Sequence, residues 1–329
     1  MDNLTHSLVG ALIGQAGLKK KTGLAMPALI IGANLPDVDA ACFFWLDGVE
    51  HLAFRRGITH GPPALVLLPL ILAGLLWAFD RWQAGRGQKR FGRPEGRLPV
   101  RFGWLYALSF IGCLTHPALD WLNVYGIRLL EPFSSRWFYG DTLFIIDVWL
   151  WGLMGFATWW SLRQEKRGGA WRRTGRQALA LVLVYIGVNG AITQSHQRMT
   201  PLNAVGPVIA SPLPFAFWER EIIIPLENGR YKLIPRYSGP TDENVSSQTL
   251  GDPTLSYYCD LDTLAALNSQ TRSFLFWSRA PFVERDEEGN PWLRDARFYD
   301  PRARDRFSVR VPDVACEPLK TEPVSGAGG

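Results

Sequence analysis

The first residues of this 329-residue chain lack the features of a cleavable secretory signal. Residues 1–6 contain no lysine or arginine, and no small-residue cleavage site follows the first apolar run. We therefore expect this segment to stay on the protein as its first structural element.

Cysteine is scarce, with four residues in the chain. Cys42 and Cys113 lie in or beside apolar runs, where we expect them to pack as small hydrophobic side chains. Cys259 and Cys316 lie in the polar part and would pair only if that part faces an oxidising compartment.

Long apolar runs are absent after residue 195, where Pro, Arg, Asp and Glu are frequent, but they dominate the residues before it. Four runs have about the length that crosses a hydrocarbon core. Two earlier runs are too short to span it comfortably, so we expect them to be tilted, half-inserted or packed within the bundle. The long runs are 62–79, 102–119, 143–162 and 177–192, and the short ones are 4–18 and 24–35.

The positive net charge of +5 does not by itself indicate a nucleic-acid partner, because the basic residues cluster in short loops next to the apolar runs. The segments 19–21, 81–101 and 163–176 contain sixteen Lys and Arg residues, whereas the opposite loops, 36–61 and 120–142, contain four. The positive-inside rule therefore predicts that the basic loops are cytoplasmic. The N-terminus and everything after residue 192 would then lie outside, in the periplasm of a bacterial cell.

Histidine and aspartate recur at the outer ends of these runs. Burying an ionisable side chain there costs free energy unless the group binds an ion, a ligand or another side chain. His116 and Asp120 are four residues apart, so a helix presents both on one face. With the predicted orientation, all the candidate residues come to one side of the bilayer. They are His6, Asp37, Asp39, His60, His116 and Asp120, joined less firmly by Asp141 and Asp147.

Imidazole and carboxylate are the ligands that suit zinc or a similar divalent metal, and a catalytic site leaves one position open for water. We expect one or two ions. The predicted metal ligands are His6, Asp39, His60, His116 and Asp120. The predicted catalytic residues are Asp37 and Asp141. Thr5, Thr59 and Asp147 are expected to orient the ligands through hydrogen bonds.

Each signal also has an ordinary structural explanation. Thr5 and Thr59 are good helix caps, and the Pro36-Asp37 pair favours a turn. Asp147 lies in an apolar run, where a structural ion pair would explain it as well as a role at the site.

With these residues in place, the chain resembles the YdjM/YbcI-like inner-membrane proteins, which are described as metal-dependent hydrolases and in some cases as LexA-binding. The resemblance covers about residues 1–160 and implies a multi-pass inner-membrane protein; a LexA-type partner is implied by it alone. The motifs that carry it are Met1-Asp2-Asn3-Leu4-Thr5-His6, Asn34-Leu35-Pro36-Asp37-Val38-Asp39, Arg56-Gly57-Ile58-Thr59-His60, the segment 116–120 with Tyr125-Gly126, and Pro132-Phe133 through Asp141 to Asp147.

The order His, Asp, His, His-x-x-x-Asp is similar to that in zinc-dependent phospholipases C and related nucleases. It implies hydrolysis of a phosphoester, and a site at the bilayer surface makes a lipid headgroup the natural substrate. Those enzymes continue with further His and Glu ligands, whereas His196 is the only later histidine in this chain, so a three-zinc site is not expected.

The residues after 195 favour strands. The segments 215–224 and 231–237 flank Asn228-Gly229, a strong hairpin signal. A second hairpin is expected over 272–283 and 292–299, followed by a strand at 307–311, and residues 262–269 favour a short helix. No metal-ligand spacing or nucleophile motif occurs in this part.

The sequence thus predicts a mainly α fold, a polytopic membrane helical bundle followed by a small β-rich extramembrane domain. The predicted domains are residues 1–195, residues 196–317 and a disordered tail over 318–329. The expected function is hydrolysis of an amphipathic or lipid substrate at the outer bilayer surface by a metal-dependent enzyme, with no nucleic-acid partner. A non-enzymatic scaffold or regulatory protein with a structural metal or polar network is the main alternative, and a transporter is the third.

Overall fold

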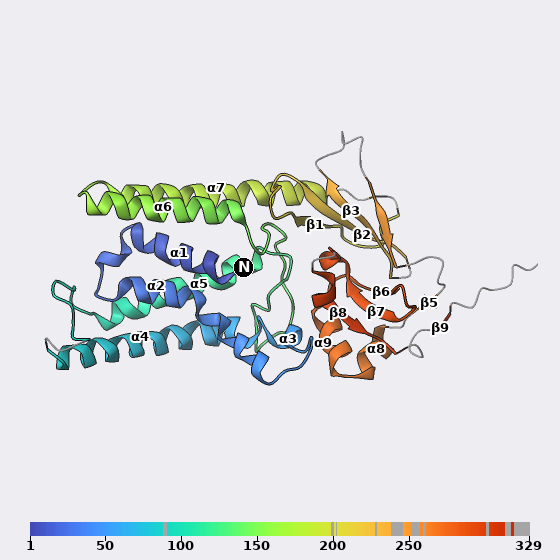
Figure 1. Cartoon of the computed structure of the whole chain (residues 1–329), viewed down its shortest axis with the longest axis horizontal. Helices are drawn as coiled ribbons and strands as arrows, with labels where there is room; N and C mark the ends of the chain where they lie inside the picture. The colour runs from blue at the N-terminus through green and yellow to red at the C-terminus, as the bar shows by residue number, and fades with distance from the viewer. Residues whose placement is uncertain are drawn as a thin grey trace, which may run out of the picture. The chain divides into compact units, whose positions relative to one another are not determined.

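The structure is a computed structural model, shown in Figure 1, and its elements follow the predicted order of helices and then strands. The residues that it describes are 1–87, 91–198, 201, 203–227, 229–237, 246–251, 257–258, 261–300, 303–312 and 317–318. Two compact units emerge. The first, called the membrane unit below, comprises Met1–Ala41, Arg55–Ser195 and Ser211–Glu219; the second comprises Cys42–Phe54, His196–Ala210 and Arg220–Gly329.

Four helices in the described part of the chain are long and apolar enough to cross a membrane. They are Ala25–Phe44, which joins α2 (Ala25–Asn34) to the 3-10 helix η2 (Leu35–Phe44), α4 (Pro62–Gly85), α5 (Phe102–Trp121) and α7 (Trp171–Gln197). The prediction of a polytopic helical bundle followed by a β-rich region is confirmed.

Two of the predicted runs differ from the structure. The run 24–35 is not short, because η2 continues α2 directly and the combined helix has 20 residues. The run 143–162 begins later as α6 (Val148–Lys166), since the Asp147 side chain accepts hydrogen bonds from two backbone N–H groups and starts the helix there. Rich in Trp and Gly and charged at its end, α6 is not one of the four apolar helices.

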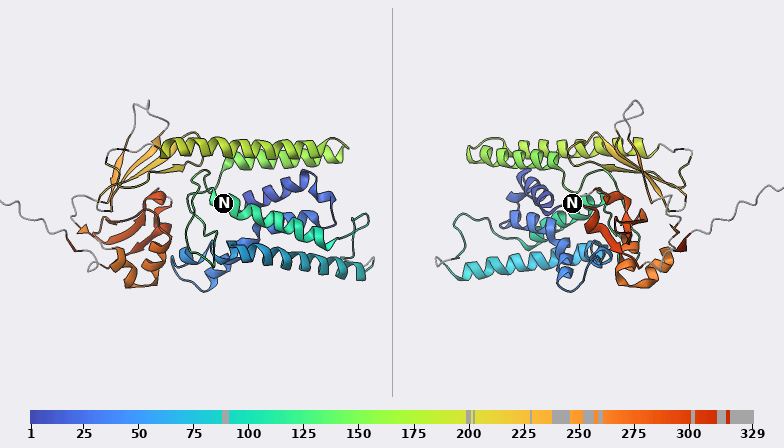
Figure 2. Two further views of the ribbon diagram at one scale, coloured as in Figure 1. Left: turned by 180° about the vertical axis from the view of Figure 1, so that it is seen from behind. Right: turned by 45° about the vertical axis from the view of Figure 1, so that its right-hand side comes forward.

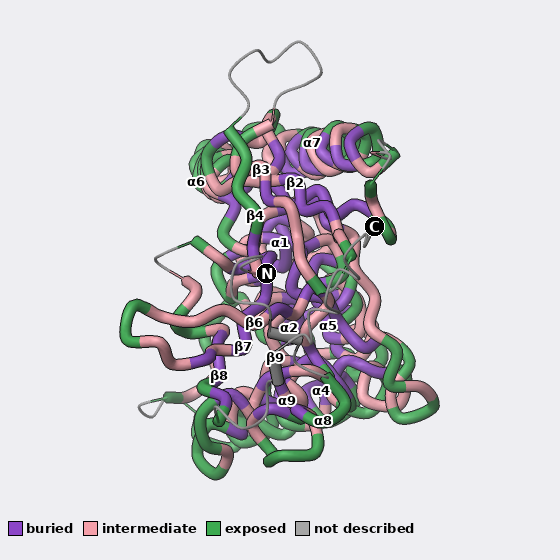
Figure 3. Tube along the Cα trace, turned by 90° about the vertical axis from the view of Figure 1, so that its right-hand side faces the viewer, coloured by how far each residue is buried: buried purple, intermediate pink, exposed green. Residues whose placement is uncertain are grey.

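The helices of the membrane unit pack around two apolar clusters. One combines α1 (Asn3–Gln15) with α6 and α7, and the other combines α2 with α4 and α5. Helices α6 and α7 run side by side in both views of Figure 2. Along α7, buried and exposed positions alternate around the helix, as Figure 3 shows, so one side of it packs inward.

Glycines bring α1, α2 and α5 into backbone contact. A Cβ atom at Gly10 would lie 2.7 Å from the Leu29 carbonyl oxygen, and one at Gly112 would lie 2.5 Å from the same oxygen. At Gly32 it would lie 2.7 Å from the carbonyl oxygen of Ser109. Small residues at helix crossings are the usual means of close approach in membranes. His6 and His116 each lie one turn from such a contact, which sets their separation.

The second unit contains short antiparallel sheets. One has the order β1 (Ile209–Pro212), β2 (Arg220–Pro225), β3 (Tyr231–Tyr237), β4 (Gln248–Leu250); another has β6 (Pro281–Arg285), β7 (Pro291–Asp295), β8 (Ser308–Arg310); β5 (Tyr257–Tyr258) pairs with β9 (Glu317–Pro318). The predicted hairpin is confirmed by the pairing of Ile223 with Leu233, but its first strand was predicted from residue 215 and β2 begins only at Arg220. The predicted helix at 262–269 is present as α8 (Leu261–Leu267).

One predicted strand is wrong. Residues 272–277 belong to α9 (Ser269–Trp277), because the Asn268 side chain accepts a hydrogen bond from the Thr271 backbone and starts a helix. Phe274 and Trp277, three residues apart, are fully buried on one face of it. Strand β6 starts only at Pro281, and β7 ends at Asp295. The predicted turn residue Asn228, the predicted pair Cys259 and Cys316, and the predicted tail except Pro318 lie outside the described residues.

Candidate metal centre

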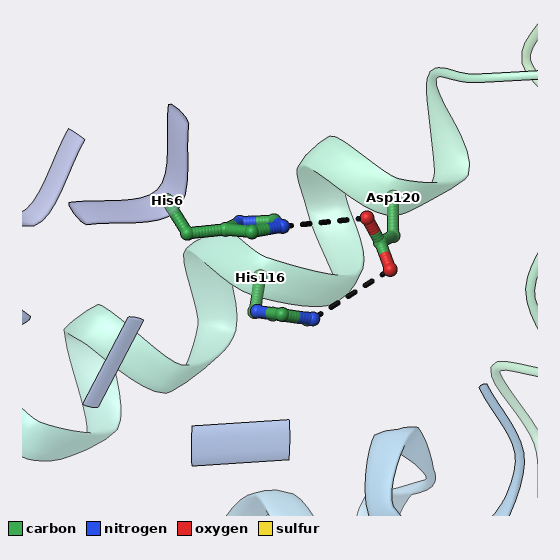
Figure 4. Close-up of side chains that lie close together, drawn as sticks. All are labelled: His6, His116 and Asp120. Carbon is green, nitrogen blue, oxygen red and sulfur yellow. Dashed lines mark ion pairs between the residues drawn. The ribbon is translucent and has the colours of Figure 1, made fainter. Parts of the chain in front are cut away.

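The centre of the candidate site is the carboxylate of Asp120 near the end of α5. His116 lies one turn earlier on the same face, with its Nε2 atom 3.6 Å from Asp120 Oδ2. From α1, the His6 ring stacks on that of His116 with centroids 3.8 Å apart, and its Nε2 atom lies 3.4 Å from Asp120 Oδ1 (Figure 4). Helix α5 therefore supplies two of the groups and α1 a third, all of them fully buried.

A third imidazole comes from the 3-10 helix η3 (Ile58–His60), immediately before α4. His60 Nε2 lies 3.8 Å from Asp120 Oδ2, and the His60 and His116 ring centroids are 5.0 Å apart. The backbone next to His60 approaches Glu131 so closely that a Cβ atom at Gly61 would overlap the Glu131 carbonyl oxygen, and glycine is therefore required there. The three predicted histidine ligands thus converge on one carboxylate.

The two aspartates of η2 occupy different positions. Asp37 Oδ1 lies 3.7 Å from His116 Nε2, so that Asp37, His60 and His116 form a second group whose ligand atoms all lie within 4.8 Å of one another. Asp39 Oδ2 instead accepts hydrogen bonds from the Arg56 N–H at 2.8 Å and the Thr59 hydroxyl at 3.2 Å. The sequence assigned the ligand role to Asp39 and the catalytic role to Asp37, but the structure places Asp37 among the ligand-type atoms and Asp39 behind them.

Hydrogen bonds on the far side of the rings fix the histidine orientations. His116 Nδ1 lies 2.7 Å from the Ala33 carbonyl oxygen, which can only accept, so Nδ1 carries a proton and Nε2 is the ring nitrogen that faces the carboxylates. His60 Nδ1 lies 2.9 Å from the Thr59 hydroxyl and 3.6 Å from Asp39 Oδ2. Such partners of the second ring nitrogen are typical of metal-binding histidines. Burial also lowers the pKa of His60 well below its ordinary value and so favours the neutral ring that binds metals.

The inward-facing atoms have no hydrogen-bond partner among the described residues. These buried atoms are His6 Nδ1 and Nε2, His60 Nε2, His116 Nε2 and Asp120 Oδ2, whose contacts with one another and with Arg56 are ion pairs without hydrogen-bond geometry. Buried polar atoms are rarely left without a hydrogen bond, and a cation that several of them coordinate would satisfy them together. In a tetrahedral site with bonds of about 2.1 Å, ligand atoms lie about 3.4 Å apart. The distances of 3.4 to 3.8 Å to Asp120 are close to that value, and the donor set therefore fits a divalent cation.

Cationic groups also contact the central carboxylate. Arg56 Nε lies 3.0 Å from Asp120 Oδ2, and the N-terminal ammonium of Met1 pairs with Asp120 Oδ1. The Arg56 guanidinium lies over the Tyr125 ring at 4.3 Å and donates to Asn123 Oδ1 at 3.1 Å. The backbone of Arg56 is left-handed, with φ of 55°, a conformation that non-glycine residues adopt at a cost.

Sequence reasoning missed Arg56 and its neighbour Arg55. Arg55 entered only the count of basic residues, and Arg56 entered that count and the motif Arg56-Gly57-Ile58-Thr59-His60, but neither was predicted to contact the site. The adjacent pair Arg55-Arg56, directly before the segment that contains His60, could have indicated that arginines contact the site.

The remaining predicted site residues lie elsewhere or have other partners. Asp147 caps α6, accepting from the Leu150 N–H at 2.9 Å, and the Tyr185 hydroxyl donates to it at 3.0 Å. The Thr5 hydroxyl donates to the Asp2 carboxylate that caps α1. Asp141 is buried and its carbonyl accepts from the Thr193 hydroxyl at 2.7 Å, but it belongs to neither ligand-type group found among the described residues.

A bundle of apolar helices with a buried cluster of imidazoles and carboxylates at their ends defines a polytopic membrane protein with a candidate metal centre. The family model of the YdjM inner membrane protein matches residues 1–196, more than half of the chain. The chain therefore belongs to the YdjM inner membrane protein family, as its motifs predicted. No curated protein and no solved structure matches it.

Proposed function

We propose that this protein is a membrane-bound, metal-dependent hydrolase that cleaves a phosphoester or related bond of a lipid or amphipathic substrate. The observation that carries the proposal is the convergence of three buried imidazoles, those of His6, His60 and His116, on Asp120, with Nε2 atoms that accept or donate no hydrogen bond among the described residues. Membership of the family supports the membrane location.

Three histidines and one aspartate are the proposed metal ligands. His6, His60, His116 and Asp120 would hold the ion, which we take to be zinc because imidazole and carboxylate donors suit it. The two ligand-type groups share His116, so the cluster has donors for one ion or for two. A bound divalent ion would supply Lewis acidity and activate water for hydrolysis.

The carboxylates of η2 would supply the proton chemistry and the orientation. Where Asp37 is not itself a ligand, its carboxylate, with 11% of the side chain exposed, would accept a proton from an incoming water as a general base. Asp39 keeps the Nδ1 side of His60 engaged and so aims its Nε2 atom at the site.

We infer that the site and the chain after residue 192 face the periplasm. The support is the sixteen basic residues in the loops at the opposite ends of the helices, against four on the side of the site. The substrate would then be reached from the outer bilayer surface.

The test is elemental analysis of the detergent-purified protein beside a His116→Ala variant, together with hydrolysis of a panel of phosphoester lipids. We expect about one or two zinc ions per wild-type chain, and loss of zinc and of hydrolysis in the variant. His51→Ala, which removes a histidine outside the ligand-type groups, is the matched control and should keep both. A metal-free wild type, or a His116→Ala variant with full activity, would refute the proposal.

The contacts of Arg56 and the Met1 ammonium with Asp120 favour one alternative, a structural polar network with no enzymatic role. In that case the purified protein would contain no metal, and His116→Ala would lower its thermal stability without affecting any hydrolysis. A fully coordinated ion with four protein ligands and no water would likewise favour a structural role.

A further inference from the structure

Side-chain exposure is uneven around the candidate metal centre, and its more exposed residues, Asp37 and Arg55, are called the entrance below. The side chains of His6, His60, His116 and Asp120 are at most 1% exposed, and that of Asp39 is 2% exposed. Exposure rises to 11% at Asp37 and 24% at Arg55. Among these residues, Asp37 and Arg55 are therefore the ones that an incoming molecule meets first.

The carboxylate of Asp37 lies between Arg55 and the imidazole of His116. Its Nη2 atom is 3.0 Å from Asp37 Oδ1 and its Nε atom is 3.4 Å from Asp39 Oδ1. The same oxygen of Asp37 is 3.7 Å from His116 Nε2. An ion held by the Asp37 group would draw on this oxygen, so that its contact with the guanidinium would weaken.

The charges of the cluster favour an anionic ligand. The carboxylates of Asp37, Asp39 and Asp120 are balanced by the guanidiniums of Arg55 and Arg56 and the Met1 ammonium. A divalent cation would leave an excess of positive charge. Among buried, poorly solvated groups such an excess favours a bound anion.

Two exposed apolar side chains adjoin the entrance residues in sequence. Val38 follows Asp37 on η2 and is 53% exposed, and Ile58, three positions after Arg55, is 57% exposed. Exposed apolar surface next to polar residues is typical of sites that contact membranes or ligands. The entrance thus has a cationic group and neighbouring apolar residues.

We propose that Arg55 binds the phosphate group of an amphiphilic substrate at the entrance of the metal centre, while Val38 and Ile58 contact its apolar part. Guanidinium is suited to this role because its planar donors match two phosphate oxygens at once. The inference rests on the proposed function and names the residue that selects its substrate class.

The experiment uses the full chain in dodecyl maltoside, loaded with zinc, and measures the binding of inorganic phosphate by calorimetry. A second arm measures binding of dioleoyl phosphatidate in mixed micelles. Variants Arg55→Ala and Arg55→Gln remove the charge, and the second keeps hydrogen-bond donors toward Asp37 should the first not fold. Arg136→Ala removes an exposed arginine from a loop of the same predicted side and is the control. Zinc content is measured for every sample.

We expect both Arg55 variants to keep their zinc but to bind phosphate about tenfold or more weakly, since a hydrogen bond to a charged group accounts for a change of that size. Arg136→Ala should bind as the wild type does. Phosphatidate that binds more tightly than inorganic phosphate, with both affinities dependent on Arg55, would support the whole proposal. Equal affinities that depend on Arg55 would support the phosphate contact and overturn the contact of Val38 and Ile58 with the apolar part.

Phosphate and phosphatidate affinities that are the same in the Arg55 variants and the wild type would overturn it, as would zinc-loaded wild type that binds neither. The zinc measurement separates these outcomes from failure of the proposed function, which a zinc-free wild type would show.

Discussion

Replacement of Gly112 by alanine tests whether helix contact sets the geometry of the candidate metal centre. The added Cβ atom would lie 2.5 Å from the Leu29 carbonyl oxygen, where ordinary contacts begin at 3.4 Å. Both partners are helix backbone, so α2 and α5 must separate locally by about 0.9 Å.

Such a separation acts on His116, one turn along α5. The hydrogen bond from its Nδ1 atom to the Ala33 carbonyl, now 2.7 Å, would lengthen to about 3.6 Å, beyond a useful hydrogen bond. The orientation of Nε2 would be lost, and we expect metal affinity to fall about tenfold or more, as for other changes to the partners of metal-binding histidines.

Stability should change less than metal affinity. Overpacking costs about 1 to 3 kcal/mol, and alanine returns up to about 1 kcal/mol through its higher helix propensity. A net loss of about 1 to 2 kcal/mol corresponds to a Tm lower by about 2 to 8 °C.

The assay is zinc binding by competition with a chelator, beside thermal unfolding in detergent. Gly155→Ala is the control, because a Cβ atom at Gly155 in α6 would have nothing within 4 Å, and we expect normal zinc binding and an unchanged or slightly higher Tm. The reasoning would be refuted by a Gly112→Ala variant that binds zinc as tightly as Gly155→Ala does.

Two further predictions concern residues outside the metal centre. Asp147→Ala should lower the free energy of unfolding by about 1 kcal/mol, because the helix cap to the N–H groups of Trp149 and Leu150 is lost. The zinc content should not change. Loss of zinc would instead place Asp147 at the site. Burial, with the negative charge of Asp300, raises the pKa of Glu221 from 4.5 to about 8. The folded state then holds the proton more tightly, so stability of the second unit is full below pH 4.5 and declines as pH rises towards 8. Glu221→Gln should remove this decline and stabilise the unit by about 2 kcal/mol at pH 9, allowing for partial solvent exposure, as measured by limited proteolysis on heating at pH 5 and pH 9. An equal decline in both proteins would contradict this.

The sequence already determined the membrane character and much of the candidate site. Apolar runs of sufficient length have no stable place outside lipid or a core, so their number and order predict a bundle. The four-residue spacing of His116 and Asp120 places both on one face of any helix, whatever surrounds it.

Helix boundaries depended on local hydrogen bonds that hydropathy does not report. Asp147 lies within an apolar run, yet its carboxylate caps the N-terminus of α6, so the helix begins at Val148 and not at the start of the run. Residues 272–277 favoured a strand by composition, but the cap at Asn268 and the spacing of Phe274 and Trp277 make them helical.

Only the tertiary structure decided which aspartate of η2 joins the histidines. Asp37 and Asp39 are two residues apart and chemically identical, and their roles differ because Arg56 and Thr59, distant in sequence, engage Asp39. The role of Arg56 likewise depends on a left-handed backbone and on Asp120, 64 positions away along the printed sequence. Sequence spacing specifies which side chains share a face of one element, but contacts between elements depend on how closely the helices pack, and here the glycines at the crossings of α1, α2 and α5 set that distance.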